Sequence, residues 1–181
     1  MDFAQEAALV EAVLLLEVEP VEEALLARIT GLGLTAVRQA LDVLKERCEA
    51  PNSGLEPVRI AGGWTLSPKE RYWNVLKDRY GKQREEKLSR AALETLSIIA
   101  YSQPLTRSEV ENIRGVGAEG MVRLLKDKGL IREVGRKDSP GRPVLYGTTK
   151  EFLKIFRLES IADLPKLDEL EEKRFALDEP R

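Results

Sequence analysis

A short stretch near the C-terminal end of the chain has the composition of a phosphate-binding loop. The sequence GRKDSPGRPVLYGTT, residues 135–149, places Arg136, Lys137 and Arg142 around an Asp-Ser-Pro-Gly turn. Clustered cations on a turn can contact nucleic-acid phosphates, because each neutralised phosphate releases a counterion. Cations are also common on solvated turns that only join two strands. These three residues are therefore candidate phosphate contacts, with a plain connecting turn as the alternative.

The residue types needed for most enzyme chemistry are scarce. The 181 residues include no histidine and one cysteine, Cys48, so the commonest general base and metal ligand is missing and no intrachain disulfide can form. No constellation of acid, base and nucleophile can be placed. The chain is not expected to be an enzyme or to hold a cofactor or metal, and Cys48 is expected to fill a core or surface position.

The composition predicts a cytoplasmic protein with real hydrophobic cores. Hydrophobic residues make up 43% of the chain and charged residues 33%, which is ordinary for a globular protein. A membrane span needs roughly 18 apolar residues. The apolar run Ala7–Leu16 is shorter, contains Glu11 and has no basic leader, so neither a span nor a signal peptide is predicted.

Charge and apolar periodicity divide the chain into parts. Residues 82–157 carry sixteen Lys or Arg against ten Asp or Glu, a net of +6, whereas the segments on either side each have a net charge of −4. The periodicity stops at the charged stretch GKQREEKLS and then restarts. We therefore predict domains at 1–80 and 89–158, a linker at 81–88 and a flexible acidic tail at 159–181.

The second domain shows its architecture most clearly. Apolar residues at helical spacing predict a helix over 89–101, and two further helices follow at 107–115 and 117–128. Thr106 and Glu109 form a capping box at the start of the middle helix, and Thr148 and Glu151 form another before the closing helix KEFLKIF. Between the third helix and the closing helix, the spacing of apolar residues changes from about 3.6 to about two, which predicts the strands LIREVG and PVLYG.

The first domain repeats this order. The sequence ITGLG at 29–33 recurs as IRGVG at 113–117, and helices are predicted at 6–18, 21–29 and 35–49 before strands near Val58 and Trp64. Three helices, a hairpin and a closing helix are typical of a winged helix. The predicted fold is therefore mainly α with small β-hairpin wings, in two tandem winged-helix domains.

Winged helices often bind DNA, with the third helix in the major groove and the wing on the backbone. The helix 117–128 contains no Asn, Gln, Ser or Thr, and Arg123 is its one candidate for reading bases. Sequence-specific readout is not expected. A winged-helix DNA-binding transcriptional regulator remains the alternative function, which a steep salt dependence of duplex binding would support.

Several motifs carry a resemblance to a known family. The sequences ALETLSIIAYSQPLTRSEVENIRGV, GLIREVGRKDSPGRPVLYGTTKEF and ESIADLP resemble the bacterial segregation and condensation protein B (ScpB) family almost continuously from Leu88 to Pro165. The first domain is similar only through its size, EPV after the first helix and GGW in the hairpin. The resemblance implies a non-enzymatic homodimer on the nucleoid that binds the kleisin ScpA. In that family the kleisin bridges the ATPase heads of an SMC protein, and the complex supports chromosome condensation and partition. DNA contact is then weak or indirect.

Candidate binding surfaces follow from residue type. The helix AALVEAVLLLEV is apolar on more than one face: Leu9, Val13 and Leu16 suit the core, whereas Val10, Leu14 and Leu15 are candidates for a dimer seam. Deeper burial is the alternative, and the resemblance favours the seam. For the kleisin, the candidates are Tyr101, Gln103, Arg107 and Arg114, because Tyr and Arg most often anchor interfaces. Tyr101 could instead cap its helix, and Gln103 could satisfy turn backbone.

Overall fold

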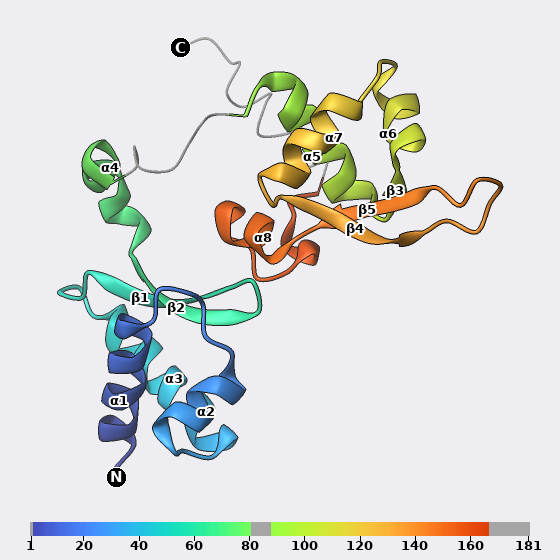
Figure 1. The fold of residues 1–181 in the computed structure, drawn as a ribbon. Helices are drawn as coiled ribbons and strands as arrows, with labels where there is room; N and C mark the ends of the chain where they lie inside the picture. The colour runs from blue at the N-terminus through green and yellow to red at the C-terminus, as the bar shows by residue number, and fades with distance from the viewer. Residues whose placement is uncertain (1, 81–87, 167–181) are drawn as a thin grey trace.

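The computed structural model describes residues 2–80 and 88–166, and these form two groups of helices, each with a small sheet (Figure 1). The first group contains α1 (Phe3–Leu16), α2 (Glu23–Thr30), α3 (Leu34–Glu49), β1 (Leu55–Ile60), β2 (Gly63–Pro68) and α4 (Glu70–Tyr80). The second contains α5 (Arg90–Ser102), β3 (Leu105–Thr106), α6 (Arg107–Arg114), α7 (Glu119–Asp127), β4 (Ile131–Arg136), β5 (Val144–Thr148), α8 (Lys150–Phe156) and a 3-10 turn (Ile161–Asp163). This order confirms the predicted fold of two tandem winged helices.

The first core lies between α1, α2, α3 and the antiparallel hairpin β1–β2. Its fully buried leucines are Leu26, Leu41 and Leu44, and Trp64 of β2 closes one side. Val21, between α1 and α2, exchanges two backbone hydrogen bonds of 2.8 Å with Trp64, which ties the chain to the hairpin. α1 begins earlier than predicted because Asp2 and Gln5 form a capping box.

The second core is formed by α5, α6, α7 and α8 together with a three-stranded sheet. The strand order is β3-β5-β4, with all pairs antiparallel. Leu96, Ile99, Leu125 and Phe152 are buried in this core. The capping box of Thr106 and Glu109 at α6 is confirmed.

The repeated Gly-containing motifs occupy equivalent places in the two winged helices. Gly31 ends α2 with φ 72° and ψ 8°, and Gly115 ends α6 with φ 74° and ψ 2°. Both residues take the left-handed conformation that favours glycine at a helix C-terminus. The recurrence of ITGLG as IRGVG therefore reflects the same helix-ending turn in both units.

One local prediction is wrong. The cap of α8 is Thr149, which accepts from the Phe152 N–H, whereas Thr148 ends β5. Residues 159–166, within the predicted tail, include the 3-10 turn Ile161–Asp163, and Leu164 packs on the second core. The predicted linker before Leu88 and the tail beyond residue 166 lie outside the described residues.

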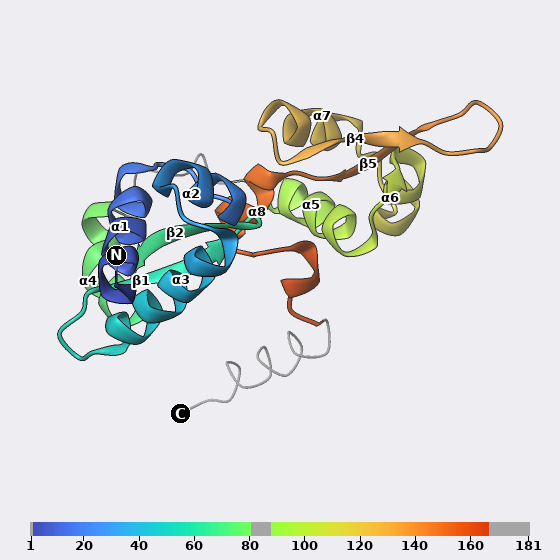
Figure 2. The ribbon, with the colours of Figure 1, turned by 90° about the horizontal axis from the view of Figure 1, so that it is seen from below.

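α8 and α4 have different relations to the rest of the molecule. Figures 1 and 2 both place α8 where the two winged helices meet. Arg157, the residue that caps the C-terminus of α8, takes a left-handed conformation with φ 56° and ψ 39°. α4 follows the β1–β2 hairpin and buries none of its own residues. Among the described residues, one helix therefore lies at a junction and another has no buried residue of its own.

Candidate interaction surfaces

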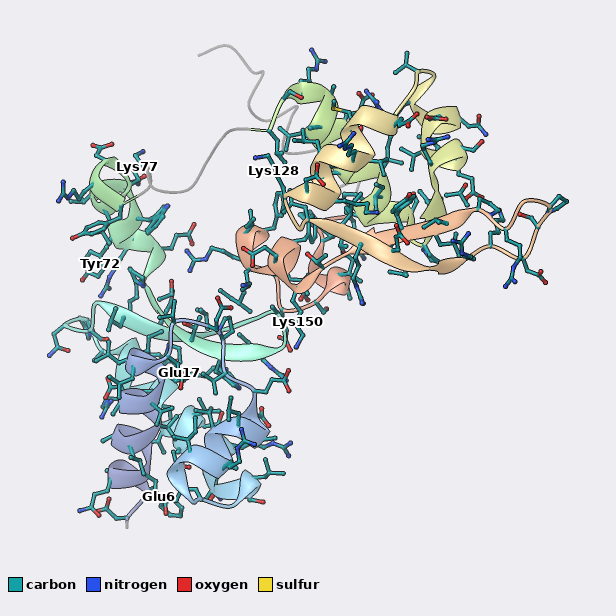
Figure 3. The ribbon with its side chains drawn as sticks, viewed as in Figure 1. Glu6, Glu17, Tyr72, Lys77, Lys128 and Lys150 are labelled. Atoms are coloured by element: carbon teal, nitrogen blue, oxygen red, sulfur yellow. The ribbon has the colours of Figure 1, made fainter. Side chains whose placement is uncertain are left out.

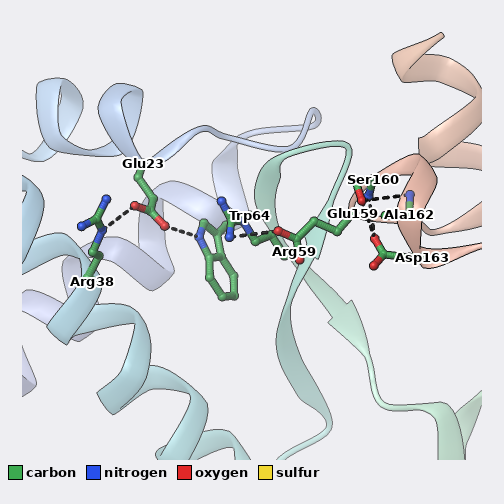
Figure 4. A network of polar contacts seen from close by, with 8 residues as sticks. All are labelled: Glu23, Arg38, Arg59, Trp64, Glu159, Ser160, Ala162 and Asp163. Atoms are coloured by element: carbon green, nitrogen blue, oxygen red, sulfur yellow. Dashed lines mark hydrogen bonds and ion pairs between the residues drawn. The ribbon is translucent and has the colours of Figure 1, made fainter.

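A polar network around Trp64 joins the second and third helices of the first winged helix to its hairpin (Figure 4). Arg38 Nε donates to Glu23 at 2.8 Å, and Trp64 Nε1 donates to the other oxygen of Glu23 at 3.4 Å. The Lys45 ammonium lies 4.7 Å from the centre of the Trp64 ring. The hydrogen bond from Arg38 lowers the pKa of Glu23 below its ordinary 4.5. Because Arg38 is already paired, α3 offers little free charge for reading bases.

The four predicted kleisin-binding residues each have a partner within the second winged helix. The Tyr101 hydroxyl donates to the Pro165 carbonyl at 2.8 Å, and Arg107 pairs with Glu119 at 3.2 Å. Gln103 bridges α5 to β5, since it accepts from the Thr148 N–H at 2.7 Å.

Arg114 is the least accessible of the four. Its side chain is 5% exposed and binds Glu94 at 3.2 Å and the Gly117 carbonyl at 3.2 Å. These contacts make Gln103 and Arg114 bridges between elements of the second winged helix, and their contact with the kleisin stays a prediction. Tyr101 and Arg107 keep exposed surface.

The predicted dimer seam on α1 is only partly exposed. Val10 and Leu14 are 0% and 2% exposed in the first core, so the prediction that they point away from it is wrong. Leu15 is exposed, as predicted, and Leu16, predicted to be buried, is 81% exposed. Val10, Val13 and Leu14 are buried in the first core, which leaves the C-terminal end of α1 as the apolar surface.

The apolar surface at the end of α1 continues toward α4. Val18 is 93% exposed, and it lines a groove of about 490 Å³ together with Leu66, Trp73, Tyr80 and Ile155. Sequence reasoning did not single out Trp73 and Tyr80. Trp73 and Tyr80 are seven residues apart, so they lie on one face of α4, a helix that has no buried residues. This spacing is the sequence pattern that could have identified the face.

The wing of the second winged helix is a long hairpin that projects beyond the helices (Figure 1). Lys137 at its base pairs with Glu109 of α6 at 2.5 Å, and the Arg136 guanidinium donates to the Arg142 carbonyl at 3.1 Å. Arg142 takes a positive φ of 41° in the turn. Lys137 is therefore neutralised, whereas Arg136 and Arg142 remain exposed cations on the wing.

The Glu109 carboxylate makes stability depend on acid pH. The hydrogen bond from Lys137, followed by those from the Thr106 N–H and hydroxyl, lowers the pKa of Glu109 from 4.5 to about 2. A lowered folded-state pKa gives stability that is present above the unfolded value and is lost as pH falls from about 4.5 to about 2. We expect Glu109→Gln to flatten this acid loss in thermal unfolding measured against pH. Glu46→Gln, which changes an exposed carboxylate of α3, should have the same dependence of thermal unfolding on pH as the wild type. If the wild type, Glu109→Gln and Glu46→Gln all lost stability equally at acid pH, the prediction would be wrong.

The described residues offer no site for metal chemistry and no membrane helix. Within residues 2–80 and 88–166, no three Asp, Glu, His or Cys side chains converge on a point where a metal ion would bind. None of the helices in these ranges has the length and apolar character that a bilayer crossing requires. The surfaces found in the described structure are instead apolar or charged faces suited to macromolecular contact.

Two winged helices with exposed apolar and charged faces define a protein that acts through contacts with other macromolecules. The sequence matches the family model of the segregation and condensation complex subunit ScpB over residues 8–167. The chain belongs to the ScpB family. It is therefore a non-catalytic subunit of the SMC complex that acts in chromosome segregation and condensation.

Two relatives agree with this assignment. Segregation and condensation protein B of Symbiobacterium thermophilum is 40% identical over 160 residues, which are 88% of this chain and 73% of that protein. The protein of the same name from Desulforamulus reducens is 43% identical over 160 residues, which are 88% of this chain and 87% of that protein. The crystal structure of ScpB from Mycobacterium tuberculosis is 31% identical, with a TM-score of 0.41 and coverage of 86% and 97%.

Proposed function

We propose that this chain forms a homodimer through its first winged helix and binds the kleisin ScpA through its second. Through the kleisin it would join the SMC protein on the nucleoid, in the cytoplasm. The observation that carries the dimer is the exposed apolar surface at the end of α1 and along α4. The kleisin as partner follows from membership in the ScpB family.

The proposed dimer surface consists of Leu15, Leu16 and Val18 with Trp73 and Tyr80. All five side chains are exposed in the single chain. Contiguous apolar patches of this kind are uncommon on proteins that act alone, and aromatic residues often anchor interfaces. A second copy of the chain can cover this patch with the same residues, because a two-fold interface brings one surface against itself.

The proposed kleisin surface contains Tyr101 and Arg107. Tyr101 is an exposed residue in the last turn of α5. Arg107 is the first residue of α6, and its guanidinium forms ion pairs with Glu111 and Glu119. Both are residue types enriched at binding hot spots. Because Arg107 is half exposed, an acidic partner side chain could replace one of its present ion pairs.

Light scattering of the full chain tests the dimer. We expect twice the chain mass for the wild type and a single-chain mass for Leu16→Lys/Val18→Lys, because two cations cannot be buried unpaired in the seam. Ile113→Lys/Val116→Lys replaces two exposed apolar residues of the second winged helix and should keep the double mass. A monomeric wild type, or a dimeric seam variant, would refute this interface.

Titration calorimetry with the kleisin from the same genome tests the second surface. Arg107→Glu should weaken binding about tenfold or more, as for a hot-spot residue. Arg90→Glu makes the same charge change at the start of α5 and should bind like the wild type, since an acid is favourable at a helix N-terminus. Equal affinities for all three proteins would place the kleisin elsewhere.

DNA contact is proposed to be weak or indirect. Arg136 and Arg142 on the wing supply two exposed cations, and few phosphate contacts give low affinity and a shallow salt dependence. Tight duplex binding with a steep negative salt slope would instead favour the alternative function, a transcriptional regulator.

A further inference from the structure

The turn of the first wing contacts the second winged helix directly. Ala61 and Gly62 form this turn with positive φ values of 52° and 80°. The Ala61 N–H donates to the carbonyl of Leu158, just beyond α8, at 2.8 Å. The tip of a wing is usually free for a nucleic-acid backbone or solvent, whereas this backbone donor is occupied within the same chain.

Two ion pairs lie beside this backbone contact. Lys150 Nζ is 2.9 Å from Glu22 Oε1, and Lys154 Nζ is 2.8 Å from Glu19 Oε2. Figure 3 shows Lys150 at the place where the two winged helices meet. The hydrogen bond from Lys150 lowers the pKa of Glu22. The acids belong to the acidic first part of the chain and the lysines to the basic second part, so the contact is complementary in charge.

A third pair has the opposite polarity. Arg59 of β1 lies 2.9 Å from Glu159, and Glu159 precedes the 3-10 turn capped by Ser160 and Asp163 (Figure 4). The Arg157 guanidinium donates to the Ser67 hydroxyl of β2. The hairpin of the first winged helix therefore holds the segment 157–159 at several points.

The junction contains little buried apolar surface. The first core and the second core are separate clusters with no shared residue. A cavity of about 360 Å³ opens between the two sides and is lined by Glu19, Glu22, Ala61, Lys150 and Lys154. Exposed ion pairs contribute little each and are weakened by salt, because the Debye length falls to about 3 Å at 1 M. A junction built in this way is weak and sensitive to ionic strength.

From these contacts we propose that the first wing and the segment just before α2 form a salt-sensitive clamp that holds the two winged helices in one arrangement. The interdomain clamp comprises Glu19, Glu22, Arg59 and Ala61 on one side and Lys150, Lys154, Leu158 and Glu159 on the other. While the clamp is closed, the first wing is not available to nucleic acid. Opening it frees acidic groups on one winged helix and basic groups on the other, and lets the two reorient. This inference does not depend on the proposed dimer or kleisin surfaces.

Distance measurements by electron spin resonance test the clamp in the full chain. Spin labels at Asp42→Cys in α3 and Arg123→Cys in α7, in a Cys48→Ala background, report the separation of the two winged helices. An excess of unlabelled chain leaves one labelled chain in each assembly. We expect one narrow distance distribution at about 0.1 M salt and a broader, longer one at about 1 M.

Charge reversal separates the clamp from general salt effects. Glu19→Lys/Glu22→Lys should shift the closed-to-open ratio on the order of tenfold toward open at low salt, since two attractions become repulsions. Adding Lys150→Glu/Lys154→Glu restores opposite charges and should return the narrow distribution. Glu46→Lys/Glu49→Lys makes the same charge change on α3 and should behave like the wild type. A distribution unchanged by both salt and reversal, or no recovery in the fourfold variant, would overturn the proposal.

Discussion

Replacing Trp64 by alanine is expected to lower the free energy of unfolding of the first winged helix by about 3–5 kcal/mol, as for other large-to-small changes in a core. The ring is 8% exposed and closes the side of the core formed by the hairpin. The variant leaves a cavity there and removes the contact with the Lys45 ammonium. Urea denaturation followed by far-ultraviolet circular dichroism measures the change.

Trp64→Phe distinguishes packing from hydrogen bonding. Phenylalanine keeps an aromatic ring in the core but removes the donor to Glu23, whose bond of 3.4 Å is long. We therefore expect a loss of about 1 kcal/mol from that bond, well below that of alanine. If alanine cost no more than phenylalanine, the ring would not be the main support of this side of the core.

The second large effect is expected at Gly63, where the chain passes closely over itself. A Cβ at this position would lie 2.7 Å from the Pro20 carbonyl carbon, 2.8 Å from its oxygen and 2.9 Å from the Val21 nitrogen. Backbone atoms cannot rotate away as a flexible side chain can. Gly63→Ala should therefore cost about 1–3 kcal/mol, as overpacking does, and disturb the bridge between Val21 and Trp64.

Gly54→Ala is the matched control. A Cβ at Gly54 would meet no atom within 4 Å, and its backbone does not require a positive φ. Alanine there should leave stability unchanged or raise it by about 0.4–1 kcal/mol, because it restricts the unfolded chain. Thermal unfolding compares the two variants. If Gly63→Ala melted at the temperature of Gly54→Ala, the hairpin would not be held as closely to Pro20 as the structure places it.

The sequence was sufficient where local chemistry decides the structure. Thr106 and Glu109 cap α6 because both partners lie within one turn, and Gly31 and Gly115 end their helices because the left-handed conformation favours glycine. The change of period after Lys128 located the second hairpin. These signals were enough to predict two winged helices.

The sequence was insufficient where distant residues decide the structure. α1 is apolar on more than one face, so periodicity did not identify Val10 and Leu14 as core residues. Gln103 bonds Thr148, 45 residues away, and Arg114 bonds Glu94, 20 residues away. The pairing of Lys150 with Glu22 spans 128 residues. No local pattern contains such partners, so these residues were either assigned to a binding surface or not singled out.

The end of α8 shows a conflict between local preference and long-range contact. Arg157 is in the left-handed conformation, which costs a non-glycine residue roughly 1–2 kcal/mol. Glycine would end this helix without that cost, so the stability of the second winged helix alone does not account for arginine. The side chain reaches Ser67 in the first winged helix, which glycine could not do. In the language of energy landscapes, Arg157 is a locally frustrated site, whose local cost is set against a contact that joins the two winged helices.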